Sequence, residues 1–364
     1  MNTTQGKRLD PEVFRLPVQR LRQGWYSDAY LNQTKRLLEL EDHRPKVKMQ
    51  VFQREEALLG GIDEALAVLR LCSGRELESG QWKLGWEELV VEALHEGEAI
   101  SAGETVMTIE GDYSLFAHLE TVYLGCLSRR SLVMRNVREA VAAAQGKPIL
   151  FFPARHDHWL VQTGDGYSAH VAGAIGVSTD AQASWWGGRG VGTVPHALIA
   201  AYNGDTVAAA QAFARHYAEE VNVTVLVDFA NHSVCTALEV ADALGEQLWG
   251  VRLDTAAGLV DYDLAERLGR EASPGVTPEL AELVREALDR TGHPNVRIVA
   301  SGGFTIERIR EFEEWGAAVD AYGVGSALLE GSNDFTADVV MVDGRPCAKV
   351  GRELRPNSRL QRVV

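Results

Sequence analysis

Two glycine-containing triplets follow apolar runs that lie about twenty residues apart. Ser301, Gly302 and Gly303 form the first triplet, and Gly323 and Gly325 flank the second. Glycine lets backbone N–H groups approach an anion closely, and the N-terminus of a following helix adds partial positive charge. We therefore expect these residues to bind the phosphate of a ligand. The alternative is that the glycines only form tight turns between strands and helices.

A histidine stands in a pattern typical of the start of a helix. Thr193 is a common N-cap residue, Pro195 suits the first turn, and His196 follows. The unpaired N–H groups at such a position would stabilise a phosphoryl group on the imidazole. This interpretation makes His196 a nucleophile. The alternative is a half-buried histidine that is hydrogen-bonded to a neighbour.

The apolar run after Lys147 ends in Arg155-His156-Asp157-His158. A planar guanidinium binds a carboxylate through two hydrogen bonds, so Arg155 is predicted to bind an acidic substrate. If the segment stays extended, Arg155 and Asp157 share one face, and His156 and His158 share the other. A His-x-His pair can bind zinc, but the sequence marks no third ligand.

Acidic residues follow other apolar runs. Asp228, Asp254 and Asp261 could bind ribose hydroxyls or Mg²⁺, or they could cap helices. Arg252 precedes Asp254 at the end of its run and, with Thr193, is predicted to contact substrate. The sequence does not assign metal ligands.

The elements that must hold these residues belong to two predicted domains. From residue 146 to 334, short apolar runs alternate with helical segments, which predicts a parallel sheet covered on both faces. We predict an irregular α/β barrel, whose strand ends at the carboxyl side would carry the residues above. Residues 169–179 could form one further strand. Residues 1–145 predict an α+β domain with helices over 54–70 and 115–143, which the tail, 335–364, completes through a hairpin at Asp343-Gly344.

The composition of the chain argues against several classes of function. The chain has 364 residues and a formal charge of −15, which disfavours binding to nucleic acid. No apolar run is long enough to span a membrane. The four cysteines are scattered and predict free thiols in a reducing compartment, as in a cytoplasmic enzyme. No lysine occurs between Lys147 and Lys349, which argues against Schiff-base chemistry in the barrel.

Together these segments resemble the nicotinate phosphoribosyltransferases, especially the shorter form of archaea and some bacteria. The resemblance runs nearly end to end and is carried by SDAYLNQTKR (27–36), MQVFQR (49–54), GTVPHALI (192–199), VLVDFANHS (225–233), GVRLDT (250–255), ASGGFTIERI (300–309), DAYGVGSAL (320–328) and FTADVVMVDGRPCAKVGR (335–352). It implies a type II phosphoribosyltransferase that acts as a homodimer. Such an enzyme would convert nicotinate and phosphoribosyl pyrophosphate (PRPP) to nicotinate mononucleotide, with Mg²⁺ as cofactor and ATP as co-substrate.

The resemblance also implies roles for single residues. His196 matches the histidine that the family phosphorylates, and Tyr30 matches the aromatic residue that stacks on the pyridine ring across the dimer. Arg155 matches the arginine that binds the nicotinate carboxylate, and Asp228 and Asp254 match an acidic pair near the ribose and metal. The cradle for the 5′-phosphate would comprise Ser301, Gly302, Gly303, Gly323 and Gly325.

Three departures from the family pattern concern substrate choice and metal geometry. His156-Asp157-His158 follows Arg155, Asn231 stands where an aspartate is common, and residues 256–258 read Ala-Ala-Gly. Two alternatives therefore stay open. One is a quinolinate phosphoribosyltransferase, whose dicarboxylate substrate calls for a denser basic pocket. The other is a non-catalytic relative that senses nucleotides.

Overall fold

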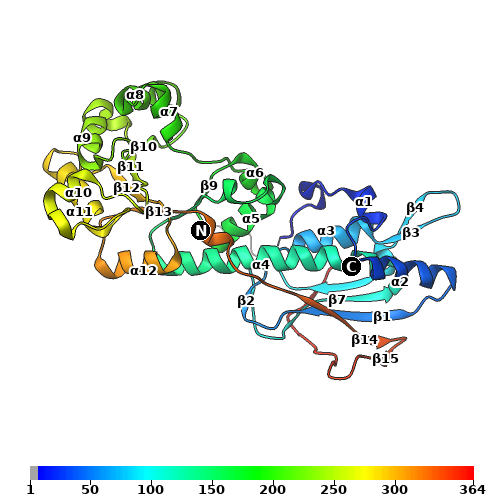
Figure 1. Cartoon of the computed structure of the whole chain (residues 1–364). Coiled ribbons are helices and arrows are strands. Elements are labelled where there is room, and N and C mark those ends of the chain that lie inside the picture. Colours follow the sequence, from blue (N-terminus) through cyan, green and yellow to red (C-terminus); the bar gives the residue numbers. More distant parts are fainter. Residues whose placement is uncertain (1–6) are drawn as a thin grey trace. The chain divides into compact units, whose positions relative to one another are not determined.

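The computed structural model describes residues 7–364 (Figure 1). The chain divides into two compact units. The first comprises the residues up to Arg135 together with Gly331–Val364, and the second comprises Asn136–Glu330. Both units contribute residues to the longest helix, α4 (Glu120–Ala143).

The first unit contains a six-stranded antiparallel sheet in the order β15-β14-β1-β7-β5-β16. Its strands are β1 (Lys46–Phe52), β5 (Val90–Ala93), β7 (Thr105–Asp112), β14 (Thr336–Val342), β15 (Arg345–Pro346) and β16 (Gln361–Arg362). Three of these strands come from the C-terminal tail, which confirms that the tail returns to the amino-terminal fold. The predicted hairpin is also present, with Asp343 and Gly344 at positive φ (48° and 76°) between β14 and β15.

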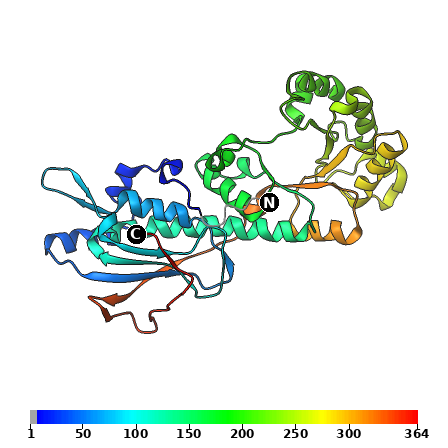
Figure 2. The same ribbon diagram turned by 180° about the vertical axis from the view of Figure 1, so that it is seen from behind.

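Helix α3 (Ile62–Cys72) lies on one face of this sheet (Figures 1 and 2). Its fully buried Val68 and Leu69 belong to the same core as Val51 of β1 and Ile109 of β7. The remaining elements are α1 (Val18–Arg22), α2 (Ala29–Leu40), α3 (Ile62–Cys72), β2 (Ala57–Leu58) paired with β6 (Ala99–Ile100), β3 (Gly74–Glu76) paired with β4 (Trp82–Leu84), η1 (Pro11–Phe14), η2 (Trp86–Glu88), η3 (Tyr113–Leu115) and η4 (Ala117–Leu119).

The helix predicted over residues 54–70 begins only at Ile62. Residues 57–58 pair with β6 instead, and Gly61 adopts a left-handed φ of 78° just before the helix. The carboxyl group of Glu96 then accepts hydrogen bonds from the N–H groups of Gly61 and Asp63 (2.7 and 3.3 Å). A long-range cap, which local spacing does not reveal, therefore sets the start of α3.

The second unit contains the predicted parallel sheet, in the order β10-β11-β12-β13-β8-β9. All of its strand pairs are parallel. The strands are β8 (Ile149–Phe151), β9 (Gly176–Val177), β10 (Thr224–Leu226), β11 (Gly250–Leu253), β12 (Arg297–Ala300) and β13 (Ala321–Val324). Their side chains are nearly all buried, as expected for strands covered on both faces.

Helices alternate with these strands. They are α5 (Gln162–Ala172), α6 (Asp180–Ala183), α7 (His196–Ala201), α8 (Thr206–Tyr217), α9 (Ser233–Leu244), α10 (Tyr262–Leu268), α11 (Pro278–Arg290) and α12 (Ile306–Trp315), with the short 3-10 helices η5 (Ala154–His156), η6 (Trp159–Val161), η7 (Ser184–Trp186), η8 (Gly245–Gln247), η9 (Gly269–Glu271) and η10 (Ser326–Leu329). The prediction of a strand over residues 169–179 is wrong for most of that range, because α5 continues to Ala172 and is capped by Gly173 (φ 112°). Only β9 remains of it.

Residues 191–194 link the two edges of the parallel sheet. The N–H of Val191 donates to the carbonyl of Val177 in β9 (2.7 Å), and the N–H of Val194 donates to the carbonyl of Thr224 in β10 (2.8 Å). Val194 also forms a parallel bridge with Val225. The ring of strands closes through this irregular segment, which confirms the prediction of an irregular α/β barrel.

The cysteines and the lengths of the helices bear on the compartment and on the membrane. Cys72, Cys126, Cys235 and Cys347 are free thiols. Over residues 7–364, we find no helix with the length and apolar character needed to traverse a bilayer.

Candidate functional site

The carboxyl ends of the parallel strands carry most of the predicted site residues. Arg155 follows β8, Asp228 follows β10, Asp254 follows β11, and Ser301 follows β12. Because neighbouring parallel strands end at the same edge of a sheet, these residues come from one edge of the second unit.

A hydrogen-bonded cluster joins two of these strand ends to the closing segment. The Ser301 hydroxyl accepts a bond from Arg252 Nε (2.7 Å) and lies 2.7 Å from Asp254 Oδ1, to which it can donate. Arg252 Nη2 is 3.3 Å from the same carboxylate oxygen, and Nη1 donates to Thr193 Oγ1 (3.4 Å). Ser301 is only 1% exposed. The structure thus brings Thr193, Arg252, Asp254 and Ser301 together, and the serine hydroxyl fixes the guanidinium and the carboxylate.

His196 is the first residue of α7, as predicted. The prediction that Thr193 caps this helix is wrong. Pro195 occupies the N-cap position without a side-chain hydrogen bond, and the Thr193 hydroxyl accepts a bond from Arg252 instead. A local N-cap pattern was overridden here by a long-range contact with β11.

The imidazole of His196 is paired with a carboxylate. Its Nε2 lies 3.0 Å from Asp228 Oδ1, and its ring centroid lies 6.3 Å from that of Phe229. Burial raises the pKa of Asp228, the nearby His196 opposes this shift, and the carboxylate of Asp254 adds to it. With Nε2 held by Asp228, Nδ1 makes no hydrogen bond to a described residue and is available to a ligand.

Gly302 and Gly303 both adopt left-handed backbone conformations (φ 86° and 75°). A Cβ on Gly302 would lie 3.3 Å from backbone atoms of Asp254 and Thr255, whereas a Cβ on Gly303 would meet nothing within 4 Å. The N–H groups of Gly302 and Gly303 make no hydrogen bond to another described residue. Backbone N–H groups without a partner can bind an anion, and this role of Gly302 and Gly303 stays a prediction.

The second glycine pair has a different local role. Neither Gly323 nor Gly325 has a left-handed φ. A Cβ on Gly323 would lie 2.9 Å from the ring of Phe152, and a Cβ on Gly325 would lie 2.8 Å from the ring of His156. These glycines therefore make room for aromatic side chains that follow β8. Their contact with a phosphate stays a prediction.

Arg155 lies on the 3-10 helix η5, and so the predicted alternation of faces along residues 155–158 is wrong. The chain turns here because the N–H of His156 donates to the carbonyl of Pro153 (2.8 Å). Arg155 is exposed, and its guanidinium forms no ion pair with a described residue. His158 accepts a hydrogen bond from the N–H of Leu160 (3.3 Å) and caps η6, which is a structural role.

Phe152 is a site residue that the sequence reasoning missed. Its ring centroid lies 5.2 Å from the guanidinium carbon of Arg252, a distance typical of a cation–π contact. Two consecutive phenylalanines end the apolar run of β8, and alternation along a strand directs them to opposite faces. Phe151 is fully buried, whereas Phe152 is half-buried. The two consecutive phenylalanines are the sequence feature from which Phe152 could have been identified.

Tyr30 belongs to the first unit, near the start of α2, and 60% of its surface is exposed. Partial burial raises the pKa of Tyr30, and the carboxylates of Glu120 and Asp28 raise it further. Its stacking on a substrate ring stays a prediction.

The acidic residues divide into two kinds. Asp261 is buried, caps α10 and accepts a hydrogen bond from the Ser233 hydroxyl (2.7 Å), and so the capping alternative is confirmed for it. Asp228 and Asp254 lie near the strand ends instead. Among residues 7–364, no group of three or more histidine, cysteine or acidic side chains is arranged to hold a metal ion. Binding of Mg²⁺ near Asp228 and Asp254 stays a prediction.

Comparisons with known proteins agree with this architecture. The sequence profile of the quinolinate phosphoribosyl transferase N-terminal domain matches residues 28–131. A nicotinate phosphoribosyltransferase of Mycobacterium tuberculosis is 30% identical over 271 residues, which are 71% of this chain and 55% of that protein. The chain therefore spans about half the length of the curated relatives it matches.

Solved structures extend the match to most of the chain. The crystal structure of nicotinate-nucleotide pyrophosphorylase from Pyrococcus furiosus is 32% identical, with a TM-score of 0.77 and coverage of 96% of this chain and 85% of that one. Human nicotinic acid phosphoribosyltransferase shares the fold at 19% identity, with a TM-score of 0.64 and coverage of 88% and 75%. The chain therefore belongs to the family of the Pyrococcus nicotinate-nucleotide pyrophosphorylase, and it is similar in sequence or fold to nicotinate phosphoribosyltransferases.

Proposed function

We propose that this protein is a nicotinate phosphoribosyltransferase, which forms nicotinate mononucleotide and pyrophosphate from nicotinate and PRPP. One observation supports this most strongly. An unpaired guanidinium, an acidic pair and a left-handed glycine pair lie at the ends of strands along one edge of the same sheet. These groups match a carboxylate, a ribose with its leaving group and a phosphate, which are the parts of the two substrates.

In this proposal the protein positions the reactants and does not attack the sugar itself. Arg155 binds the nicotinate carboxylate, and the N–H groups of Gly302 and Gly303 bind the 5′-phosphate. The pyridine nitrogen attacks C1 of the ribose as the bond from C1 to pyrophosphate breaks, and the pyrophosphate leaves with the bonding electron pair. Positioning and fixed charge supply most of the acceleration in a transfer of this kind.

Asp228 and Asp254 would hold Mg²⁺ together with oxygens of PRPP. The ion would neutralise charge on the leaving pyrophosphate. Arg252 cannot move freely toward the ligand, because Ser301, Asp254 and Thr193 all bind its guanidinium. We propose that Arg252 keeps the Asp254 carboxylate oriented toward the ribose.

ATP would act through His196. Asp228 holds Nε2 of the imidazole, which leaves Nδ1 to take the γ-phosphoryl group of ATP with release of ADP. Hydrolysis of the phosphohistidine would then return the free imidazole and inorganic phosphate. The pairing of His196 with Asp228 supports the proposal, because a carboxylate bound to one ring nitrogen raises the nucleophilicity of the other nitrogen.

We further propose that the enzyme works as a homodimer in the cytoplasm. Tyr30 of the partner subunit would stack on the pyridine ring, and its largely exposed phenol ring is compatible with this role. The four free thiols support a reducing compartment.

Quinolinate phosphoribosyltransferase is the second candidate. It is favoured by the matching amino-terminal profile and by the similarity to the Pyrococcus nicotinate-nucleotide pyrophosphorylase. Quinolinate carries two carboxylates, and so it would need a second cation beside Arg155. Arg252 is already bound to Asp254 (3.3 Å), and Lys147, the single lysine of the second unit, is bound to Glu313 (2.8 Å). These pairings favour nicotinate.

An assay of mononucleotide formation tests the proposal. Purified protein is given PRPP and Mg²⁺ with nicotinate, nicotinamide or quinolinate, each with and without ATP, and product and CO₂ are measured. We expect product from nicotinate and stimulation by ATP. Release of CO₂ from quinolinate would instead establish the second candidate. PRPP binding by calorimetry without turnover of any base would indicate a non-catalytic nucleotide sensor.

A further inference from the structure

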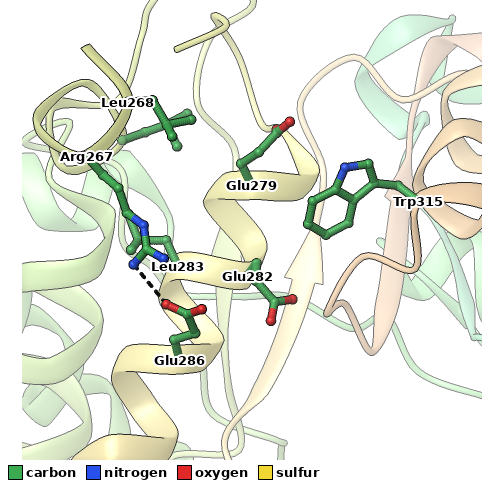
Figure 3. A pocket seen from close by; sticks show the side chains of 8 residues that line it. Arg267, Leu268, Glu279, Glu282, Leu283, Glu286 and Trp315 are labelled. Atoms are coloured by element: carbon green, nitrogen blue, oxygen red, sulfur yellow. Dashed lines mark hydrogen bonds and ion pairs between the residues drawn. The ribbon is translucent and has the colours of Figure 1, made fainter. Parts of the chain in front are cut away.

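A small cavity lies in the helical layer of the second unit, between α10, α11 and α12 (Figure 3). Its volume is about 190 Å³. Leu264, Leu268 and Leu283 give it apolar walls, and Trp315 closes one side. None of these residues belongs to the strand-end site, and so the proposed reaction gives the cavity no role.

The polar rim of the cavity is acidic and only partly neutralised. Glu286 forms an ion pair with Arg267 (2.9 Å). Glu279 and Glu282 have no hydrogen bond or ion pair with a residue of the described chain, and Figure 3 shows both across from the indole of Trp315. That indole is 48% exposed. Two free carboxylates that face an exposed indole attract a cation with an apolar stem.

The size of the cavity limits its occupant. Sites for small ligands are usually about 300–1,000 Å³, so this cavity is too small for a typical organic ligand. One long side chain fits, because its methylene groups can contact leucines while its charged end meets carboxylates. The occupant favoured by shape and charge is therefore a lysine or arginine side chain on the surface of a protein.

The chain itself presents such a side chain. Residues 343–351, which form the β14–β15 turn and the loop after it, are all exposed, and Val350 is 99% exposed. Lys349 makes no ion pair with a described residue. This basic, apolar tip complements an acidic cavity with an exposed indole, and the rest of the chain is strongly acidic.

We propose that Lys349 of one copy of this protein enters the cavity of a second copy, with its ammonium group between Glu279 and Glu282 and with Val350 against Trp315. The contact is heterologous, since a turn of one copy meets a helical face of the other. It is separate from the dimer of the proposed function, whose site residue is Tyr30.

Charge reversal tests this contact. Sedimentation velocity over a range of concentrations is measured for the wild type, Glu282→Lys, Lys349→Glu and the double variant. Each single reversal should weaken the concentration-dependent association at least about tenfold, as for a close charged pair at an interface. The double variant should restore it. Glu139→Lys, an exposed charge change on α4 outside the cavity, should match the wild type.

Two results would overturn the proposal. One is association that is unchanged in both single variants, and the other is a double variant that stays as weak as the singles. Nicotinate turnover is measured on the same samples, because these residues lie outside the strand-end site. Loss of association with normal turnover supports the contact, and unchanged association refutes it whether or not the proposed reaction occurs.

Discussion

Replacing Gly303 by alanine separates the backbone role of this glycine from its proposed role in binding phosphate. Gly303 has a φ of 75°, and a Cβ placed on it meets nothing within 4 Å. The new methyl group would therefore clash with no protein atom. A left-handed conformation costs an alanine about 1–2 kcal/mol relative to glycine, so we expect a loss of stability of that size.

The effect on binding comes from the space beside the cradle. A methyl group there would occupy volume that we assign to the phosphate and would displace at least one N–H bond to it. A hydrogen bond to a charged group contributes about 1.5–3 kcal/mol, which corresponds to about 10- to 150-fold in binding. The KM for PRPP should rise by about that factor. The KM for nicotinate should change little, because Arg155 is untouched.

Gly292 offers a matched control. Its φ is 90°, a Cβ on it would also meet nothing within 4 Å, and it lies just after α11. Gly292→Ala should lower the free energy of unfolding by the same ~1–2 kcal/mol, because its backbone would be strained in the same way. It should not change the KM for PRPP.

Urea unfolding gives the stability of both variants, and initial rates at varied PRPP and nicotinate give the two KM values. The reasoning would be refuted if Gly303→Ala were destabilised like Gly292→Ala but bound PRPP like the wild type. In that case the left-handed pair would serve only the turn between β12 and α12, and the phosphate would bind elsewhere.

Three further predictions concern other parts of the chain. Arg155→Ala should raise the KM for nicotinate by about 100-fold and leave the KM for PRPP nearly unchanged. Arg155→Lys should recover only part of the loss, because an ammonium group cannot bind a carboxylate through two parallel hydrogen bonds. A nicotinate KM that is the same in Arg155→Ala as in the wild type would show that Arg155 does not bind the carboxylate. His196→Ala should abolish stimulation by ATP while keeping basal synthesis, and stimulation that persists in steady-state rates would exclude the phosphohistidine. Burial and the Asp63 carboxylate raise the pKa of Glu96 to about 8, and so the folded protein keeps a proton that the unfolded chain loses near its ordinary value of 4.5. Thermal midpoints should therefore fall as pH rises from about 5 to about 8, and Glu96→Gln should flatten this fall; a wild-type midpoint that is constant over this range would contradict it.

The sequence predicted the parallel strands well except for β9, because the others are short runs of mostly buried side chains that end in residues with a clear chemical role. Asp228, Asp254 and Ser301 lie at strand ends for this reason. Helix starts were less predictable where the cap is distant along the chain. Glu96 caps α3 from another segment, and Thr193 binds Arg252 rather than its own helix, although its residue type suits a cap.

The sequence could not predict which side chains of the site bind one another. The bond between Arg252 and Ser301 spans 49 positions, and the register of two neighbouring strands creates it. The turn that carries Arg155 depends on a hydrogen bond between His156 and Pro153 that breaks the pattern of an extended segment. The sequence shows Phe152 at the end of an apolar run, but it does not show that the ring contacts Arg252, because that contact depends on how the neighbouring strands are placed.

The two arginines of the site illustrate how substrate selection follows from pairing. Arg252 is held by Ser301, Asp254 and Thr193, and a second substrate carboxylate could bind it only by displacing Asp254. Displacement would leave a partly buried aspartate without its cation, which is costly. Arg155 has no such partner and can accept one carboxylate with its full fork. If the proposed function is correct, the pairing of Arg252, more than the number of basic residues, would make the site favour an acid with one carboxylate over an acid with two.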